Sequence, residues 1–218
     1  MAAANKIDAI DDADRNAGPG LSPEEAGRCA VYQFLARVLS KPIDGAEASR
    51  MAPFADEATD LGRAFAAFHA RVEAAAPDAL SHEFHNLFIG VGRGELVPYA
   101  SYYLTGFLNE KPLAELRRDM DALGFERAEG VREPEDNIAT LCDLMGHLIQ
   151  GAGATPGSGD VSLYDQERFF SAHLKPWAEK FFTDLSHAKT ADIYRTVAAI
   201  GQQFMAIEAN GFAMMARA

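Results

Sequence analysis

The stretch "REPEDNIATLCDLMGHL", residues 132–148, decides the fold class. After its acidic start, apolar residues recur at helical spacing, at Ile138, Leu141, Met145 and Leu148. Apolar residues recur with the same spacing in the segments on both sides. No segment shows the sustained two-residue alternation with β-branched side chains that is typical of a strand. We therefore predict an all-α protein, a compact bundle of about eight to ten helices.

Helix boundaries can be located outward from this stretch. Ser22-Pro-Glu-Glu25 has the form of a capping box with proline in the first turn, which predicts a helix start. Between residues 91 and 112, glycines and Pro98 interrupt the helical spacing, so we predict a loop that carries clustered aromatic residues. The polar residues 1–20 predict a mobile tail, and the breaker-rich segment 151–160 a flexible connection.

The charge balance limits the partners. Lys plus Arg is 20 and Asp plus Glu is 32, so the net charge is −12. Such a surface repels phosphate backbones and anionic membranes, which argues against nucleic acid and membrane partners. It attracts a basic peptide. The alternative interpretation, that the acidity only keeps the protein soluble, remains open.

The start of the chain and its cysteines bear on location. The first residues lack the basic head and apolar stretch of a secretory signal, and no run approaches the roughly 18 apolar residues that cross a bilayer, so we expect no stable membrane insertion. Cys29 and Cys142 each lie in an apolar helical pattern, which predicts buried thiols in a reducing compartment. We expect a cytoplasmic protein.

The sequence offers no credible catalytic centre. His82 and His85 are three apart, and Asp143 and His147 four apart, but neither pair has the Glu-x-x-His form of a di-iron bundle, so we predict no metal site. Glycine-rich segments lack the Gly-Lys-Ser/Thr ending of a P-loop. There is no Gly-x-Ser-x-Gly elbow, and neither cysteine has basic neighbours. We predict that the protein is not an enzyme and holds no cofactor.

Two places depart from simple helix building. The tyrosines of 97–107 have the large apolar faces and polar tips common at interfaces. Glu133, Glu135 and Asp136 surround Pro134. Carboxylates in a first helical turn stabilise the helix dipole, so capping explains any one of them. Three around one proline exceed what capping requires, and we predict that they also receive a cation.

Three blocks of the sequence resemble the TorD/DmsD/NarJ family of chaperones for molybdenum enzymes. They are "HEFHNLFIG…VPYASYYL", "EPEDNIATLCDLM" and "FFSAHLKPWAEKFFTDL". The blocks occur in the family's order and spacing, and the resemblance covers about residues 24–210.

The resemblance implies a fold and a function. It implies a larger N-terminal lobe over 21–132, joined by a hinge to a smaller C-terminal lobe over 133–218, the two sharing one core. It implies a cytoplasmic chaperone that binds the twin-arginine leader, the apo form, or both, of the catalytic subunit of a molybdopterin-dependent oxidoreductase, and holds it for cofactor insertion. Weak GTP binding is associated with some members, and members occur as monomers or domain-swapped dimers. The client is not specified by the sequence.

The family's leader-binding positions carry over onto residues of all three segments. They are Leu87, Phe88, Gly90, Pro98, Tyr99, Ser101, Tyr103, Glu133, Pro134, Asp136 and Asn137, and we add Glu135 as a further carboxylate of the acidic cluster. The family pattern has histidine where this chain has Asn137, and an amide does not titrate near neutral pH. We expect the acids to meet the arginines and the aromatic residues to line an apolar trough.

Two other functions stay open. One is a small helical protein that binds and hydrolyses GTP with the hinge acids, for which Arg132 is the adjacent candidate for a phosphate clamp. The other is a delta-type assembly subunit acting on an enzyme that has no twin-arginine leader.

Overall fold

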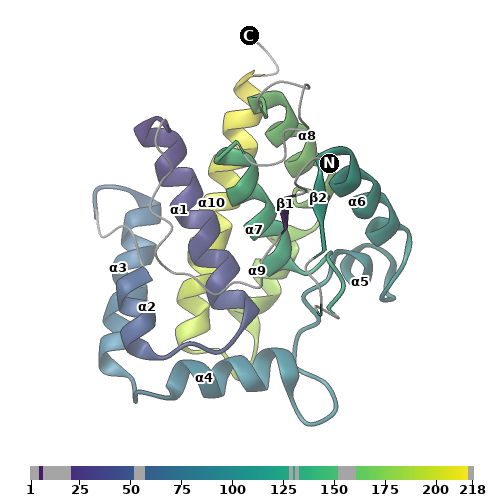
Figure 1. Cartoon of the computed structure of the whole chain (residues 1–218). Helices are drawn as coiled ribbons and strands as arrows, with labels where there is room; N and C mark the ends of the chain where they lie inside the picture. Colours follow the sequence, from purple (N-terminus) through teal and green to yellow (C-terminus); the bar gives the residue numbers. More distant parts are fainter. Residues whose placement is uncertain are drawn as a thin grey trace. The chain divides into compact units, whose positions relative to one another are not determined.

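The computed structural model describes residues 5–6, 21–51, 57–127, 130, 133–151 and 161–215. In these ranges almost all regular structure is helical (Figure 1), which confirms the all-α prediction. The helices are α1 (Pro23–Ser40), α2 (Gly45–Met51), α3 (Asp60–Ala74), α4 (Ala79–Phe84), the π-helix η1 (His85–Ile89), α5 (Ala100–Thr105), α6 (Lys111–Ala122), α7 (Ile138–Ile149), α8 (Leu163–His173), α9 (Ala178–His187) and α10 (Ile193–Met215).

The chain divides into two units, each discontinuous in sequence. The first unit comprises Met1–Arg37 and Tyr99–Pro176, and the second comprises Val38–Pro98 and Trp177–Ala218. These two units do not correspond to a single division of the chain near residue 132. The division into two lobes joined by a hinge stays a prediction. The predicted mobile tail and flexible connection lie outside the described residues, except for residues 5, 6 and 151.

The first unit contains one small exception to the all-helical pattern. β1 (Asn5–Lys6) pairs in parallel with β2 (Phe125–Glu126). This pairing joins residues about 120 apart in the sequence, so local patterning could not indicate it.

Helix α7, which contains Ile138, Leu141, Met145 and Leu148, forms the core of the first unit. Nine of its residues are buried, including Leu141, Cys142 and Met145, so the helix is apolar almost all round. Cys29 of α1 is also buried, and its Sγ donates to the carbonyl oxygen of Gly146 at 3.6 Å. Burial raises the pKa of Cys29 to about 11 and raises that of Cys142 as well. The prediction of buried thiols is confirmed.

The start of α1 is a capping box, as predicted. The Glu25 backbone N–H donates to Ser22 Oγ at 3.2 Å, and the Ser22 N–H donates to Glu25 Oε2 at 2.9 Å. The side chains of Ser22 and Glu25 thus each accept a hydrogen bond from the backbone N–H of the other residue, which stabilises the first turn of α1. The helix ends at Ser40, before Pro42.

The loop predicted between residues 91 and 112 is wrong in its centre. Residues Ala100–Thr105 form α5, and Lys111 already begins α6. The N-terminus of α5 is satisfied by Asp136, which lies far along the chain: Ser101 N–H donates to Asp136 Oδ2 at 2.8 Å. Because the capping residue is distant in the sequence, the residues just before α5 carry no capping signal that predicts the helix.

In the second unit, α10 packs along α9 and α3. Trp177 is buried and meets Phe181 edge to face, with 6.0 Å between ring centroids, so it packs in the core of this unit. The start of α10 is held by Glu83 of α4. The Glu83 carboxylate accepts from the backbone N–H groups of Asp192, Ile193 and Tyr194 at 2.7, 2.8 and 2.9 Å.

Candidate functional site

The acidic segment Glu133–Asn137 runs beside the start of α5. Tyr99 and Asn137 form an antiparallel bridge, and the Ala100 N–H donates to the carbonyl oxygen of Asp136 at 2.9 Å. The Asp136 side chain is only 1 % exposed and accepts from the Ser101 N–H. Segments 99–101 and 133–137 are therefore brought together in the first unit, as the sequence analysis expected for one site.

The helix-cap interpretation of the three acids is wrong for the helix that follows them. α7 begins at Ile138, after the acids, and has no acidic residue in its first turn. Its cap is Asn137, whose Oδ1 accepts from the Ala139 N–H at 2.8 Å. Asn137 is extended and forms the bridge to Tyr99, and the three acids precede the helix. Each acid has a separate environment instead.

Glu133 is the exposed member of the trio. Its Oε1 accepts from Tyr99 Oη and from Asn137 Nδ2, each at 2.8 Å. Burial, reinforced by the hydrogen bond to Glu133, raises the pKa of Tyr99, so the phenol stays protonated and donates. Asn137, where the family pattern has histidine, uses both ends of its amide: the oxygen caps α7 and the nitrogen holds Glu133.

Glu135 is buried and already paired with two arginines. Arg117 of α6 donates through Nε and Nη2 to Oε2 at 3.0 and 2.8 Å. Arg127 Nε lies 3.1 Å from Oε1. The Glu135 side chain is 9 % exposed, so both oxygens face guanidinium groups in a poorly solvated place. Glu135 is thus occupied within the unit, and an external arginine would have to displace Arg117 or Arg127.

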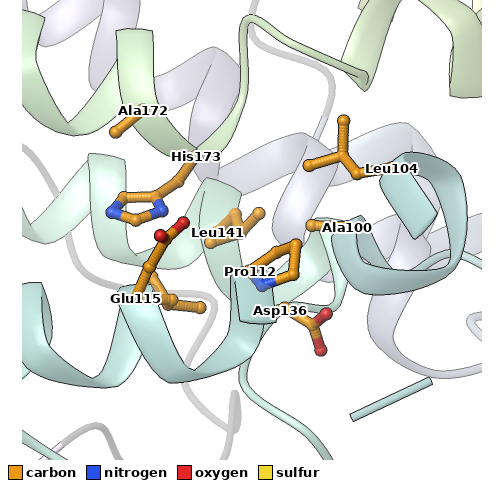
Figure 2. A pocket seen from close by; sticks show the side chains of 9 residues that line it. Ala100, Leu104, Pro112, Glu115, Asp136, Leu141, Ala172 and His173 are labelled. Carbon is orange, nitrogen blue, oxygen red and sulfur yellow. The ribbon is translucent and has the colours of Figure 1, made fainter. Parts of the chain in front are cut away.

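Asp136 lines a small pocket of the first unit (Figure 2). The pocket has a volume of about 50 Å³, and its other lining residues are Ala100, Leu104, Pro112, Glu115, Leu116, Leu141, Ala172 and His173. In Figure 2, Glu115 and His173 lie at one end and Asp136 at the other, with Pro112 between them. Among the described residues, Asp136 Oδ1 and Ser101 Oγ are buried without a hydrogen-bond partner.

His173 bridges α8 and α6 beside this pocket. Its Nε2 lies 2.7 Å from Asp119 Oδ2, and its ring lies 4.9 Å from that of Phe169. Burial lowers the pKa of His173, and the opposing effect of Asp119 does not offset it. The neutral ring therefore donates its Nε2 proton to Asp119.

The remaining predicted site residues divide between the units. Leu87, Phe88, Gly90 and Pro98 belong to the second unit, and the other eight belong to the first. Leu87 is buried in the core, while the half-buried Phe88 ring lies 5.7 Å from that of Tyr194. Gly90 has a φ of 59°, and a Cβ there would lie 2.1 Å from the carbonyl oxygen of Arg93, so a tight turn requires glycine. Tyr103 is half-buried in α5, and Pro134 is half-buried in the acidic segment.

Several residues of the site were missed by sequence reasoning. They are Leu104, Glu115, Arg117, Arg127 and His173. His173 lies in the third resemblance block, and Glu115 and Arg117 lie in α6, whose sequence carries no local signal of a binding site. The three clustered acids predict that cationic side chains lie nearby, but the sequence does not identify those side chains.

The described residues contain neither a candidate metal site nor a candidate membrane-spanning helix. Within the described ranges, no three His, Cys, Asp or Glu side chains cluster in a way that could hold a metal ion. None of the helices found there is both long and apolar enough to span a bilayer.

Known proteins resemble this chain over much of its length. A family model described as nitrate reductase delta subunit matches residues 53–183. The chain belongs to this family. The resemblance to the TorD/DmsD/NarJ chaperones that the three sequence blocks indicated is thereby confirmed.

Individual relatives of this delta-subunit family member carry chaperone names. The chaperone protein TorD of Vibrio cholerae is 31% identical over 129 residues, 58% of this chain and 59% of the relative. TorD of Vibrio atlanticus is 30% identical over 125 residues, 56% of this chain and 58% of the relative. The matches thus span less than two thirds of the length of these curated relatives.

A solved structure supports the fold. A protein assigned as a redox enzyme maturation protein of Archaeoglobus fulgidus aligns with a TM-score of 0.55, covering 82% of this chain and 93% of that chain. At 16% identity, this similarity supports the all-helical fold alone.

Proposed function

We propose that this delta-subunit family member is a maturation chaperone for a molybdopterin-dependent oxidoreductase, and that it binds the client's twin-arginine leader. The observation that carries the proposal is the similarity to proteins named TorD chaperones, at about 30% identity. Two features of the first unit support peptide binding: the acidic segment that is fixed against α5, and the exposed apolar side chains at and after the end of α5.

The charge distribution favours a cationic segment as ligand. The net charge of −12 attracts a basic peptide over long range. Glu133 is solvent-exposed and hydrogen-bonded to Tyr99, so its position is fixed before a ligand arrives. An exposed ion pair contributes about 0–1 kcal/mol, against about 1.5–3 kcal/mol for a partly desolvated charged hydrogen bond. Apolar contacts therefore supply most of the affinity, and the acids supply selectivity.

A non-catalytic role agrees with the side chains of the described residues. The thiols of Cys29 and Cys142 are buried with raised pKa values, so neither is poised as a nucleophile. Arg132, the phosphate clamp of the GTP-hydrolase alternative, lies outside the described residues. A GTP turnover assay separates the two functions, and we expect no turnover above a buffer control.

The family description, nitrate reductase delta subunit, raises a second form of this role beside leader binding. In this form, a client without a leader is recognised through its immature body. Calorimetry with the full chain distinguishes the two forms. Titration with a leader peptide tests the first, and titration with the apo catalytic subunit lacking its leader tests the second. We expect binding in the first experiment. Absence of binding in both would refute the chaperone proposal.

A further inference from the structure

The last residues of α5 and the turn after it present apolar side chains to solvent. Leu104 is 44 % exposed, Phe107 69 % and Leu108 45 %. We call residues Leu104–Leu108 the apolar turn. Exposed apolar residues that are contiguous, unlike single ones, commonly mark an interaction surface.

The backbone of the apolar turn is held in place by its own hydrogen bonds. Thr105 Oγ1 donates to the carbonyl oxygen of Ser101 at 2.7 Å, and the Phe107 N–H donates to Thr105 Oγ1 at 3.3 Å. Gly106 adopts a φ of 84° and ends α5, which a residue with a side chain does only under strain. The exposed side chains are thus displayed by an ordered segment.

The apolar turn is continuous with the pocket of Figure 2. Leu104 belongs to both, and Ala100, Pro112 and Leu141 supply further apolar wall. The polar parts of the wall are acidic or neutral: Asp136 has an oxygen without a donor, and Glu115 and a neutral His173 lie at the other end. A volume of about 50 Å³ holds a few water molecules, or a group of guanidinium size.

In the described residues, the pocket carboxylates are less fully paired than that of Glu135: Asp136 Oδ1 has no hydrogen-bond partner, and the ion pairs of Glu115 are with Oε1. Glu135 has Arg117 and Arg127 on its two oxygens. Lys111 Nζ and Arg118 Nη2 lie 3.2 and 3.9 Å from Glu115 Oε1, in exposed i,i+4 and i,i+3 pairs. Such pairs are weak and exchange readily with another cation.

We propose that the pocket and the apolar turn form one docking surface for a peptide in which a basic residue precedes apolar ones. The basic side chain enters between Asp136 and Glu115, and the apolar residues after it cover Leu104, Phe107 and Leu108. This inference rests on the proposed function and assigns Glu115 and the apolar turn to it. The ligand is identified by its chemistry: cationic first, to meet the carboxylates, and apolar next, to cover the turn.

The test is calorimetry of the full chain with a synthetic peptide that has two adjacent arginines followed by an apolar run of leucine and alanine. Phe107→Ser should weaken binding by about tenfold or more, because an aromatic side chain loses its burial in the complex. Glu115→Gln should weaken it by about two- to fivefold, as for a partly exposed charge pair.

Matched control variants replace the same kinds of side chain, one aromatic and one acidic, at other exposed positions of the first unit. Tyr164→Ser changes an aromatic residue that is 68 % exposed in α8, and Glu24→Gln an exposed acid in α1. Both should bind as the wild type does. Replacing the peptide's leucines by serine should remove the difference between Phe107→Ser and the wild type, because the turn then has no partner.

The outcomes separate this inference from the proposed function. If the wild type binds no leader peptide, the proposed function fails. If the wild type binds and Phe107→Ser and Glu115→Gln bind equally well, the docking surface is wrong while leader binding stands. Sedimentation of the same variants tests the alternative that a second copy of this chain covers the apolar turn. If Phe107→Ser dissociates an oligomer without changing peptide affinity, the turn contacts a second copy and the inference is overturned.

Discussion

Two substitutions of Asp136 separate the effect of its hydrogen bond on folding stability from the effect of its negative charge. Asp136→Ala removes the carboxylate that accepts from the Ser101 N–H at 2.8 Å in a fully buried place. Asp136→Asn keeps an oxygen acceptor there but removes the negative charge. The bond from the Ala100 N–H to the Asp136 carbonyl oxygen is retained in both variants, because the backbone makes it.

The expected magnitude follows from the lost bond. A buried hydrogen bond to a charged acceptor contributes about 1.5–3 kcal/mol, and a lost helix cap costs about 0.5–2 kcal/mol. Since the two figures describe the same contact, we expect Asp136→Ala to lower the free energy of unfolding by about 2 kcal/mol. Asp136→Asn should lower it by about 1 kcal/mol, because the Ser101 N–H keeps an acceptor without the charge.

Urea unfolding followed by circular dichroism measures both changes. Asp121→Ala, at an exposed acid of α6, is the control and should stay within about 0.5 kcal/mol of the wild type. A stability of Asp136→Ala equal to that of the control would refute the capping role. If Asp136→Asn is less stable than Asp136→Ala, the retained oxygen does not serve as the acceptor.

Three further predictions concern other parts of the fold. Glu83→Ala should lower the free energy of unfolding by about 2–3 kcal/mol, because the first N–H groups of α10 lose their acceptor; a melting temperature equal to the wild type's would count against this cap. Trp177→Ala should cost about 3–5 kcal/mol in urea unfolding through the cavity it leaves, and a loss below about 1 kcal/mol would show that the site collapses. Burial lowers the folded-state pKa of His173, so its neutral form contributes stability above the unfolded pKa of about 6.5, and this is lost as the pH falls below that value. His173→Asn should therefore unfold with a weaker dependence on pH in this range than the wild type, and identical pH profiles would contradict the assignment.

Local signals predicted most of the helices. The apolar spacing of Ile138, Leu141 and Met145 corresponds to α7, and the Ser22–Glu25 capping box starts α1. These predictions succeeded because their causes lie within a few residues of one another. The short helix α2 was not predicted, since the two charged residues and several small ones over Gly45–Met51 give little apolar periodicity.

The parts that sequence reasoning missed depend on residues that are distant in the chain. α5 looked like a loop because its cap, Asp136, lies 35 residues away. The same distance hid the fate of the acidic trio: Glu135 pairs with Arg117, 18 residues earlier, and Asp136 faces a pocket built by several helices. The acids were correctly singled out as unusual, but which of them faces a partner is decided by tertiary contacts.

Calorimetric titration of the purified full chain with a twin-arginine leader peptide tests the central claim most directly. The account predicts saturable binding that weakens moderately as salt is raised, and weakens much further when the apolar residues of the peptide are replaced by serine. Binding that is unaffected by both changes, or no heat with any leader peptide and with any immature molybdoenzyme, would contradict it.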